Sequence, residues 1–214
     1  MTLKLDEIDS RIIELLQKDG RMMYKDLARL TRVSLPTIRY RIKRLMNMGL
    51  IRGFTVVLDP SKISGKTRAI LTIEGKSADL DKIAEKLAEM KEVREVFVGV
   101  GSFGVVAKVD VDDIGQYEEL VARRISQIPE IESTKSSILV KVVKEEYGVT
   151  VKSQVGLHLK CPFCDSPISG NPYVEEIRGV PHYFSGKACA DAYKERYAEG
   201  GRKVHLEFIA SSRK

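Results

Sequence analysis

The chain has 214 residues, 43% hydrophobic and 31% charged, which suffices for ordinary folded cores and excludes a chain disordered by composition. Its longest uncharged stretch, Val96–Ala107, has twelve residues, fewer than the about 20 that a membrane helix needs. Charged residues begin at Lys4 and Asp6, unlike the apolar run of a signal peptide, so we expect a cytoplasmic protein. The three cysteines lie in the last third and favour thiolate chemistry over a disulfide framework.

Positive charge is concentrated near the start of the chain. Residues 1–60 contain 12 Lys/Arg and 7 Asp/Glu, a net charge of +5, and residues 21–52 contain nine basic residues and one acid. Such a cluster is a candidate footprint for nucleic acid, although charge alone more often marks a solvated basic face. The helical pattern of the same region decides between the two.

The first sixty residues predict three helices. Asp6 can cap the first helix, which Gly20 ends, and a short second helix is expected at Tyr24–Thr31. Ser34 is a natural N-cap for the third helix, which Gly49 follows as a stop signal. The buried stripe of that third helix consists of Ile38, Ile42 and Leu45.

The third helix has the side chains of a DNA recognition helix. It carries no acid between Ser34 and Met48, and a major groove admits one such helix, whose N-terminal residues reach base edges. We expect base contacts from Thr37, Arg39 and Tyr40, beside Ser34 and Pro36 in the first turn, and phosphate contacts from Arg32, Arg41, Lys43 and Arg44.

Three segments, Leu5–Asp9, Gln17–Arg21 and Gly49–Phe54, closely resemble the Lrp/AsnC family of prokaryotic transcription regulators. The resemblance implies a winged helix-turn-helix domain at residues 1–53 that binds double-stranded DNA. The family usually has glycine where this chain has Arg32. We therefore expect a positive φ at Arg32, at a cost of about 1 kcal/mol.

Residues 54–147 predict a ferredoxin-like domain with the order β-α-β-β-α-β. The expected elements are a strand at 68–74, a helix around 80–87, strands at 96–100 and 105–111 joined by the hairpin 101–104, a helix around 117–125, and a strand through Ile138, Val140 and Val142. An open four-stranded sheet leaves one face bare, so we expect at least a dimer.

This order resembles the effector-binding and oligomerisation domain of the same family, which implies dimers that often assemble further, up to octamers. Family members that sense amino acids usually carry an aromatic residue followed by Asp in the hairpin. The corresponding pair here is Phe103-Gly104, without a carboxylate for an amino group. Amino-acid sensing at this hairpin is therefore not expected.

Residues 157–209 predict a small metal module of treble-clef or zinc-ribbon type, which makes the whole chain an α+β protein. Cys161 and Cys164 form a Cys-x2-Cys knuckle, whose spacing suits one shared metal ion, and Cys189 follows in a predicted helix. Short strands are expected at 157–160, 173–177 and 181–184, and the helix at 185–197 ends at Gly200-Gly201.

The module resembles the TRASH domain, which is associated with trafficking, resistance and sensing of heavy metals. Its family pattern places two cysteines four positions apart, about twenty residues after a first cysteine. Here Cys164, Ser185 and Cys189 fit that spacing, with serine at the middle position. Among the three histidines of the segment, His182 is the best candidate for a fourth ligand. Three thiolates suit Cu(I), and by the same softness Ag(I) or Hg(II), whereas a set closed by His182 suits structural Zn(II).

Three hypotheses follow from these patterns. The first is a transcription regulator whose DNA affinity responds to a thiophilic metal, copper first, through altered docking of the module and altered spacing of the DNA-binding domains in a dimer. The second is an amino-acid-responsive regulator with a structural zinc module. The third is a metal chaperone or detoxification protein. No hydrolase motif or phosphate-binding glycine loop is present, so an enzyme is not expected.

Overall fold

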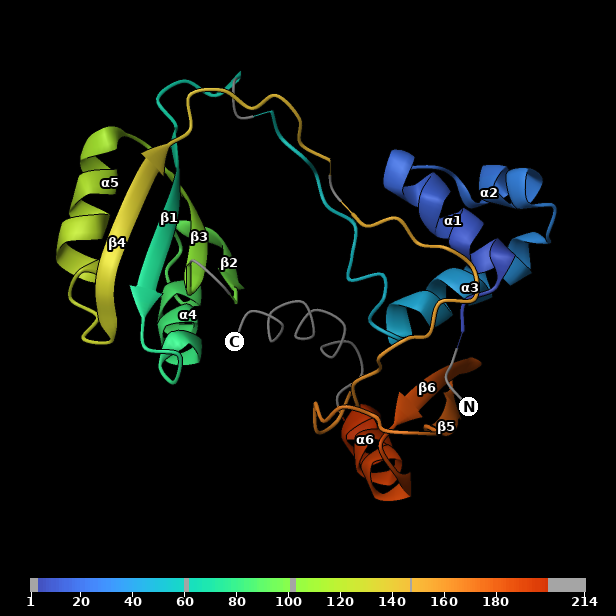
Figure 1. Ribbon diagram of the computed structural model, residues 1–214. Helices are drawn as coiled ribbons and strands as arrows, with labels where there is room; N and C mark the ends of the chain where they lie inside the picture. Colours follow the sequence, from blue (N-terminus) through green and yellow to red (C-terminus); the bar gives the residue numbers. More distant parts are fainter. Residues whose placement is uncertain (1–3, 60–61, 101–102, 147, 200–214) are drawn as a thin grey trace. The chain divides into compact units, whose positions relative to one another are not determined.

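The computed structural model describes residues 4–59, 62–100, 103–146 and 148–199. Contacts divide the chain into two units (Figure 1). One unit combines Met1–Val56 with Glu146–Ile209, and the other contains Val57–Glu145. Parts of two expectations, Gly101-Ser102 of the hairpin and residues 200–209 of the metal module, lie outside the described residues.

The first unit begins with the three expected helices, α1 (Glu7–Lys18), α2 (Tyr24–Thr31) and α3 (Leu35–Asn47). Asp6 caps α1, because its carboxylate accepts a hydrogen bond from the Asp9 N–H at 2.7 Å. Arg32 ends α2 with a φ of 57°, which confirms the left-handed conformation expected where the family has glycine. The winged helix-turn-helix is thus present in the chain.

The cysteine module belongs to the same unit as these helices. Strands β5 (Tyr173–Ile177) and β6 (Val180–Phe184) form an antiparallel hairpin, and α6 (Lys187–Glu199) follows. Arg178 and Gly179 both have positive φ, as the tightest hairpin turns require. The strand expected at 157–160 is wrong. In its place the structure has two isolated bridges, Lys4 to Gly156 just before this segment and Lys160 to Pro167 at its end.

The second unit has the expected ferredoxin-like order. Its strands, β1 (Thr67–Gly75), β2 (Val93–Val98), β3 (Val105–Val111) and β4 (Ile131–Ile138), form one antiparallel sheet in the order β2-β3-β1-β4. Its helices are α4 (Leu80–Ala88) and α5 (Ile114–Leu120), and a π-helical turn at Val121–Ile125 continues α5. In β1 and β3 alternate side chains are buried, and they pack with residues of both helices in a single core.

The last strand ends earlier than the sequence predicts. β4 stops at Ile138, and Val140 and Val142, which were expected to continue it, are exposed. The Leu139 N–H donates to the Arg68 carbonyl near the start of β1. The β1–β4 register therefore ends close to the start of β1, which begins at Thr67. Within the described residues, no helix is long and apolar enough to cross a membrane.

Candidate DNA-binding surface and metal centre

The N-terminal half of α3 presents an accessible polar and basic face. Ser34 caps the helix, accepting a hydrogen bond from the Thr37 N–H at 3.3 Å, and the two hydroxyl groups lie 2.7 Å apart. Arg39 and Lys43 are exposed, and Tyr40 retains 44% of its exposure. The outward residues at the start of α3 and in the preceding turn are Arg32, Ser34, Pro36, Arg39, Tyr40 and Lys43, with Thr37 half-buried beside them.

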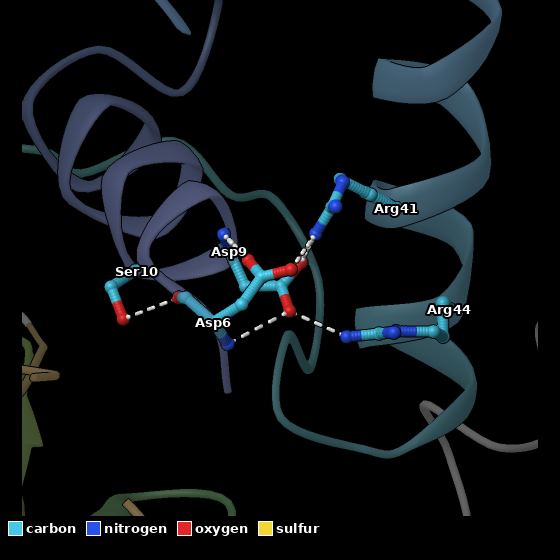
Figure 2. A network of polar contacts seen from close by, with 5 residues as sticks. All are labelled: Asp6, Asp9, Ser10, Arg41 and Arg44. Atoms are coloured by element: carbon cyan, nitrogen blue, oxygen red, sulfur yellow. Dashed lines mark hydrogen bonds and ion pairs between the residues drawn. The ribbon is translucent and has the colours of Figure 1, made fainter. Parts of the chain in front are cut away.

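Two arginines of α3 have a different role from the one expected of them. Figure 2 shows that Arg41 and Arg44 turn toward the start of α1. Arg41 donates to the carboxylates of Asp6 at 2.6 Å and Asp9 at 2.8 Å, and Arg44 donates to Asp9 at 2.5 Å. The Asp9 side chain is 0% exposed. Because their charges neutralise a buried carboxylate, these arginines tie α3 to α1, which corrects the expectation that they contact phosphates.

The electrostatics of this network agree with a structural role. Partial burial raises the pKa of Asp6, but the Asp9 N–H and the Arg41 guanidinium lower it more, so the pKa lies below its ordinary value. The Asp9 carboxylate also accepts a weaker hydrogen bond from the Asp6 N–H at 3.4 Å. Asp6 and Asp9 therefore cap the helix reciprocally while they hold the arginines.

The three cysteines converge on one point of the module. The sulfur atoms of Cys161, Cys164 and Cys189 all lie within 4.8 Å of one another, and the thiol of Cys189 approaches the sulfur of Cys164 at 3.8 Å. Cys161 is buried, Cys164 is exposed and Cys189 is intermediate. The knuckle supplies the first two thiols, and the first turn of α6 supplies the third.

The hydroxyl group of Ser185 lies beside two of the three thiols. Its hydroxyl lies 3.5 Å from the sulfur of Cys164 and 3.4 Å from that of Cys189. The structure does not bring His182 into this group. The His182 ring lies 6.4 Å from the Phe184 ring and 5.8 Å from the Tyr193 ring, centroid to centroid, and its Nδ1 is 3.1 Å from the Val180 carbonyl oxygen. Burial lowers the pKa of His182, and nearby Lys43 lowers it further, which favours the neutral ring.

The thiols differ in how readily they ionise. Hydroxyl groups of Ser166 and Ser185 lower the pKa of Cys164 to about 6, so this thiol is mainly thiolate at neutral pH. Burial raises the pKa of Cys161, but hydrogen bonds from Ser185 and from the backbone of Phe163 and Cys164 together outweigh it, so the net shift is downward. The Ser185 hydroxyl lowers the pKa of Cys189, but burial and the neighbouring thiols raise it more, and its net shift is upward.

The donor set fits a thiophilic metal ion. Sulfur atoms about 2.3 Å from a shared metal lie about 3.8 Å apart in tetrahedral and about 4.0 Å apart in trigonal geometry. The Cys164–Cys189 sulfur distance of 3.8 Å is already in that range. Cys161, Cys164 and Cys189 could therefore hold a metal with small side-chain adjustments. The spacing of the cysteines already predicted this group from the sequence.

Two features of the site were missed by sequence reasoning. Asp9 is 0% exposed on the buried face of α1, and a buried charge needs a partner that the helical pattern alone does not identify. The cysteine module also shares a core with the helices, because Leu159 and Tyr183 lie in one buried cluster with residues of α1, α2 and α3. No local sequence pattern predicts such a shared core.

The hairpin of the second unit offers no carboxylate to an effector. Phe103 is 45% exposed, and a Cβ atom at Gly104 would lie 2.4 Å from Cδ2 of Leu80. A larger residue at position 104 would therefore have to displace the Leu80 side chain from its place against the core. This packing explains the glycine without invoking a ligand.

Comparison with known proteins identifies the family. Residues 5–52 match the model described as winged helix-turn-helix DNA-binding, and residues 68–149 match the Lrp/AsnC ligand binding domain. The HTH-type transcriptional regulator FL11 of Pyrococcus abyssi is 32% identical over 152 residues, which are 71% of this chain and 100% of that protein. The regulatory protein AsnC of Haemophilus influenzae is 32% identical over 135 residues, 63% of this chain and 90% of that protein.

Solved structures agree with this result. An AsnC family transcriptional regulator from Agrobacterium tumefaciens superposes with a TM-score of 0.60 at 28% identity, covering 68% of this chain and 96% of that one. The Escherichia coli AsnC structure has the same fold, with a TM-score of 0.62 at 24% identity over 69% of this chain and 99% of that one. The chain therefore belongs to the Lrp/AsnC family of DNA-binding transcription regulators and is not an enzyme.

Proposed function

We propose that this chain is a cytoplasmic regulator whose affinity for DNA responds to a thiophilic metal bound by Cys161, Cys164 and Cys189. Cu(I) is the favoured metal. The observation that carries the proposal is that three thiols converge within 4.8 Å in the same unit as the recognition helix. The resemblance of the cysteine module to the TRASH domain adds support from the sequence.

The DNA-binding part of the proposal uses the outward side of α3. Thr37, Arg39 and Tyr40 are proposed to contact base edges, whereas Arg32 and Lys43 neutralise phosphates. Ser34 and Pro36 shape the first turn that enters the groove. Arg41 and Arg44 orient α3 through their ion pairs with Asp9.

The ligand set favours Cu(I). Ser185 offers a neutral hydroxyl, a poor ligand for a soft ion, so three thiolates dominate the site. Trigonal sulfur coordination suits Cu(I), and also Ag(I) or Hg(II). His182 would have to leave Phe184, Tyr193 and the Val180 carbonyl to complete a tetrahedral Zn(II) site.

A structural Zn(II) site is the second candidate. Among the described residues, the separate core cluster of the module contains three buried residues, Cys161, Phe184 and Ala190, so a metal would add folding energy there. An amino-acid-responsive regulator has less support, because Gly104 supplies no carboxylate. A metal chaperone has less support because the module packs into the DNA-binding domain.

We further propose three sequence domains, 1–53, 54–147 and 157–209, and a homo-oligomer of at least two chains, which in this family can extend to an octamer. The open face of the second unit's sheet supports the oligomer. Phe97 remains 55% exposed on β2, and such a face gains stability when a second copy covers it.

Metal titration with a DNA readout tests the proposal. Fluorescence anisotropy of labelled operator DNA is followed as Cu(I), Ag(I), Hg(II) or Zn(II) is added to the full chain. We expect Cu(I) and Ag(I) to weaken DNA binding at least fivefold, equivalent to about 1 kcal/mol. Cys189→Ser should abolish the response and leave metal-free binding intact. Unchanged affinity with all four metals would contradict metal sensing and leave the structural zinc site.

A further inference from the structure

Two short segments, 159–161 and 183–185, connect the thiol group to the core of the DNA-binding domain. Leu159 is 7% exposed and lies in the cluster formed by α1, α2 and α3, two residues before the ligand Cys161. Tyr183 is 6% exposed and lies in the same cluster, two residues before Ser185, whose hydroxyl is near the other two thiols. Both segments that lead to the thiol group are therefore packed against the helices.

Strand β6 makes this link through alternating side chains. Neighbouring residues of a strand point to opposite faces. Tyr183 accordingly packs with the helices, whereas Phe184 is 0% exposed and packs with Cys161 and Ala190 of the module. One strand thus lines two cores, that of the DNA-binding domain and that of the metal centre.

The same strand also contacts α3. The Asn47 side chain donates to the Pro181 carbonyl at 3.4 Å. Tyr40 and Arg44 lie close enough to influence the pKa of Tyr183, which burial raises, and Lys43 influences His182. Tyr40, Lys43, Arg44 and Asn47 are spaced three or four residues apart and share one side of the helix. Part of that side is the proposed DNA surface.

We propose that a metal ion at the three thiols acts on the recognition helix of its own chain, through Tyr183 and Leu159 as positioning residues. This inference rests on the proposed metal response. A bound ion holds three sulfurs at set distances and restrains the knuckle, β6 and the first turn of α6 together. Close-packed cores transmit such a restraint to the helices they contact. The route lies within one chain and needs no change in the spacing of the two DNA-binding domains of a dimer.

Hydrogen exchange of the full chain, with Ag(I) as the probe and no DNA, tests this route directly. We expect Ag(I) to slow exchange of α3 amides at least threefold, besides amides of the knuckle, β6 and α6. Amides of β1 and β3 serve as an internal reference. If slowing is confined to the knuckle, the hairpin and α6 in the wild-type chain, the proposal is wrong.

A matched pair of variants tests the residue that makes the link. Tyr183→Leu should bind Ag(I) within threefold of wild type, because Tyr183 is outside the thiol group, and should lose the slowing at α3. Val174→Ala is the control, since Val174 pairs with Tyr183 across the hairpin but is 51% exposed. It should retain the full response. A Tyr183→Leu chain that still slows α3 as wild type does would overturn the assignment.

The two proposals fail in different ways. If α3 slows with Ag(I) but DNA affinity does not change, the coupling stands and the metal-responsive function is wrong. If DNA affinity responds while α3 exchange is unaffected, the function stands and the coupling is overturned. The wild-type measurement decides the coupling even if Tyr183→Leu does not fold.

Discussion

Replacing Asp9 by Asn tests the ion-pair network that corrected the role of two arginines. Asn has the same shape, so the substitution removes the charge that Arg41 and Arg44 share and replaces one acceptor oxygen with an NH2 donor that faces an existing donor. Asp9 is 0% exposed, and the two arginine side chains are 17% and 22% exposed. Removing one partner of a buried ion pair costs about 3–5 kcal/mol, because the remaining charge stays buried.

The expected loss of unfolding free energy lies near the lower end of that range. Both guanidinium groups keep some contact with solvent, which screens the charge that is left, so we expect a loss of about 3 kcal/mol. Folded domains have unfolding free energies of about 5–15 kcal/mol, so this is a large fraction of the total. Glu14→Gln is the matched control. Glu14 pairs with Arg11 and Lys18 on the exposed side of the same helix and should show no measurable change.

The assay is hydrogen exchange as a function of urea concentration, read from peptides of α1, α2 and α3 at neutral pH. This readout isolates the DNA-binding domain from the second unit, which has a separate core. A loss below about 1 kcal/mol for Asp9→Asn would show that the network contributes little to stability. Arg41 and Arg44 would then be available to phosphates, as the sequence had suggested.

Four further predictions follow from the same structure. Lys43→Ala should lower the slope of log affinity against log salt by about 0.9, the value for one phosphate, while Arg44→Ala leaves the slope unchanged; equal slopes for both variants would refute this division. Cys189→Ser should weaken Ag(I) binding at least 100-fold in a competition titration and His182→Ala less than threefold; a large loss for His182→Ala would make it a ligand. Alkylation of Cys164 by iodoacetamide should reach half its maximal rate near pH 6 and slow as the pH falls below that, because its lowered pKa keeps it ionised above pH 6; half-maximal alkylation near pH 9 would contradict the hydroxyl contacts. The full chain should sediment as a dimer or larger assembly at micromolar concentration, and a monomer there would show that the sheet face needs no second copy.

Local patterns in the sequence determined most of the secondary structure. The second helix was predicted at Tyr24–Thr31, and α2 has the same bounds. The left-handed Arg32 was expected from the family resemblance, because the family usually has glycine there. The N-cap Ser34 and the β-α-β-β-α-β order were predicted from local patterns. These features depend on residues within a few positions of one another, where periodicity and capping are physically decided. The convergence of Cys161 and Cys164 is similarly local, since both belong to one tight turn.

Only the tertiary structure decided which distant groups meet. Asp9 lies 32 residues before Arg41, and no local pattern could predict that they pair. Likewise Ser185, and not His182, stands beside the thiols: His182 shares a face of β6 with Phe184, but its ring packs beside those of Phe184 and Tyr193. Tyr183 and Leu159 look like ordinary apolar residues of a small module. They join the core of the DNA-binding domain because the helices leave apolar surface that nearby chain can cover, and burial depends on packing in space, not on order along the chain.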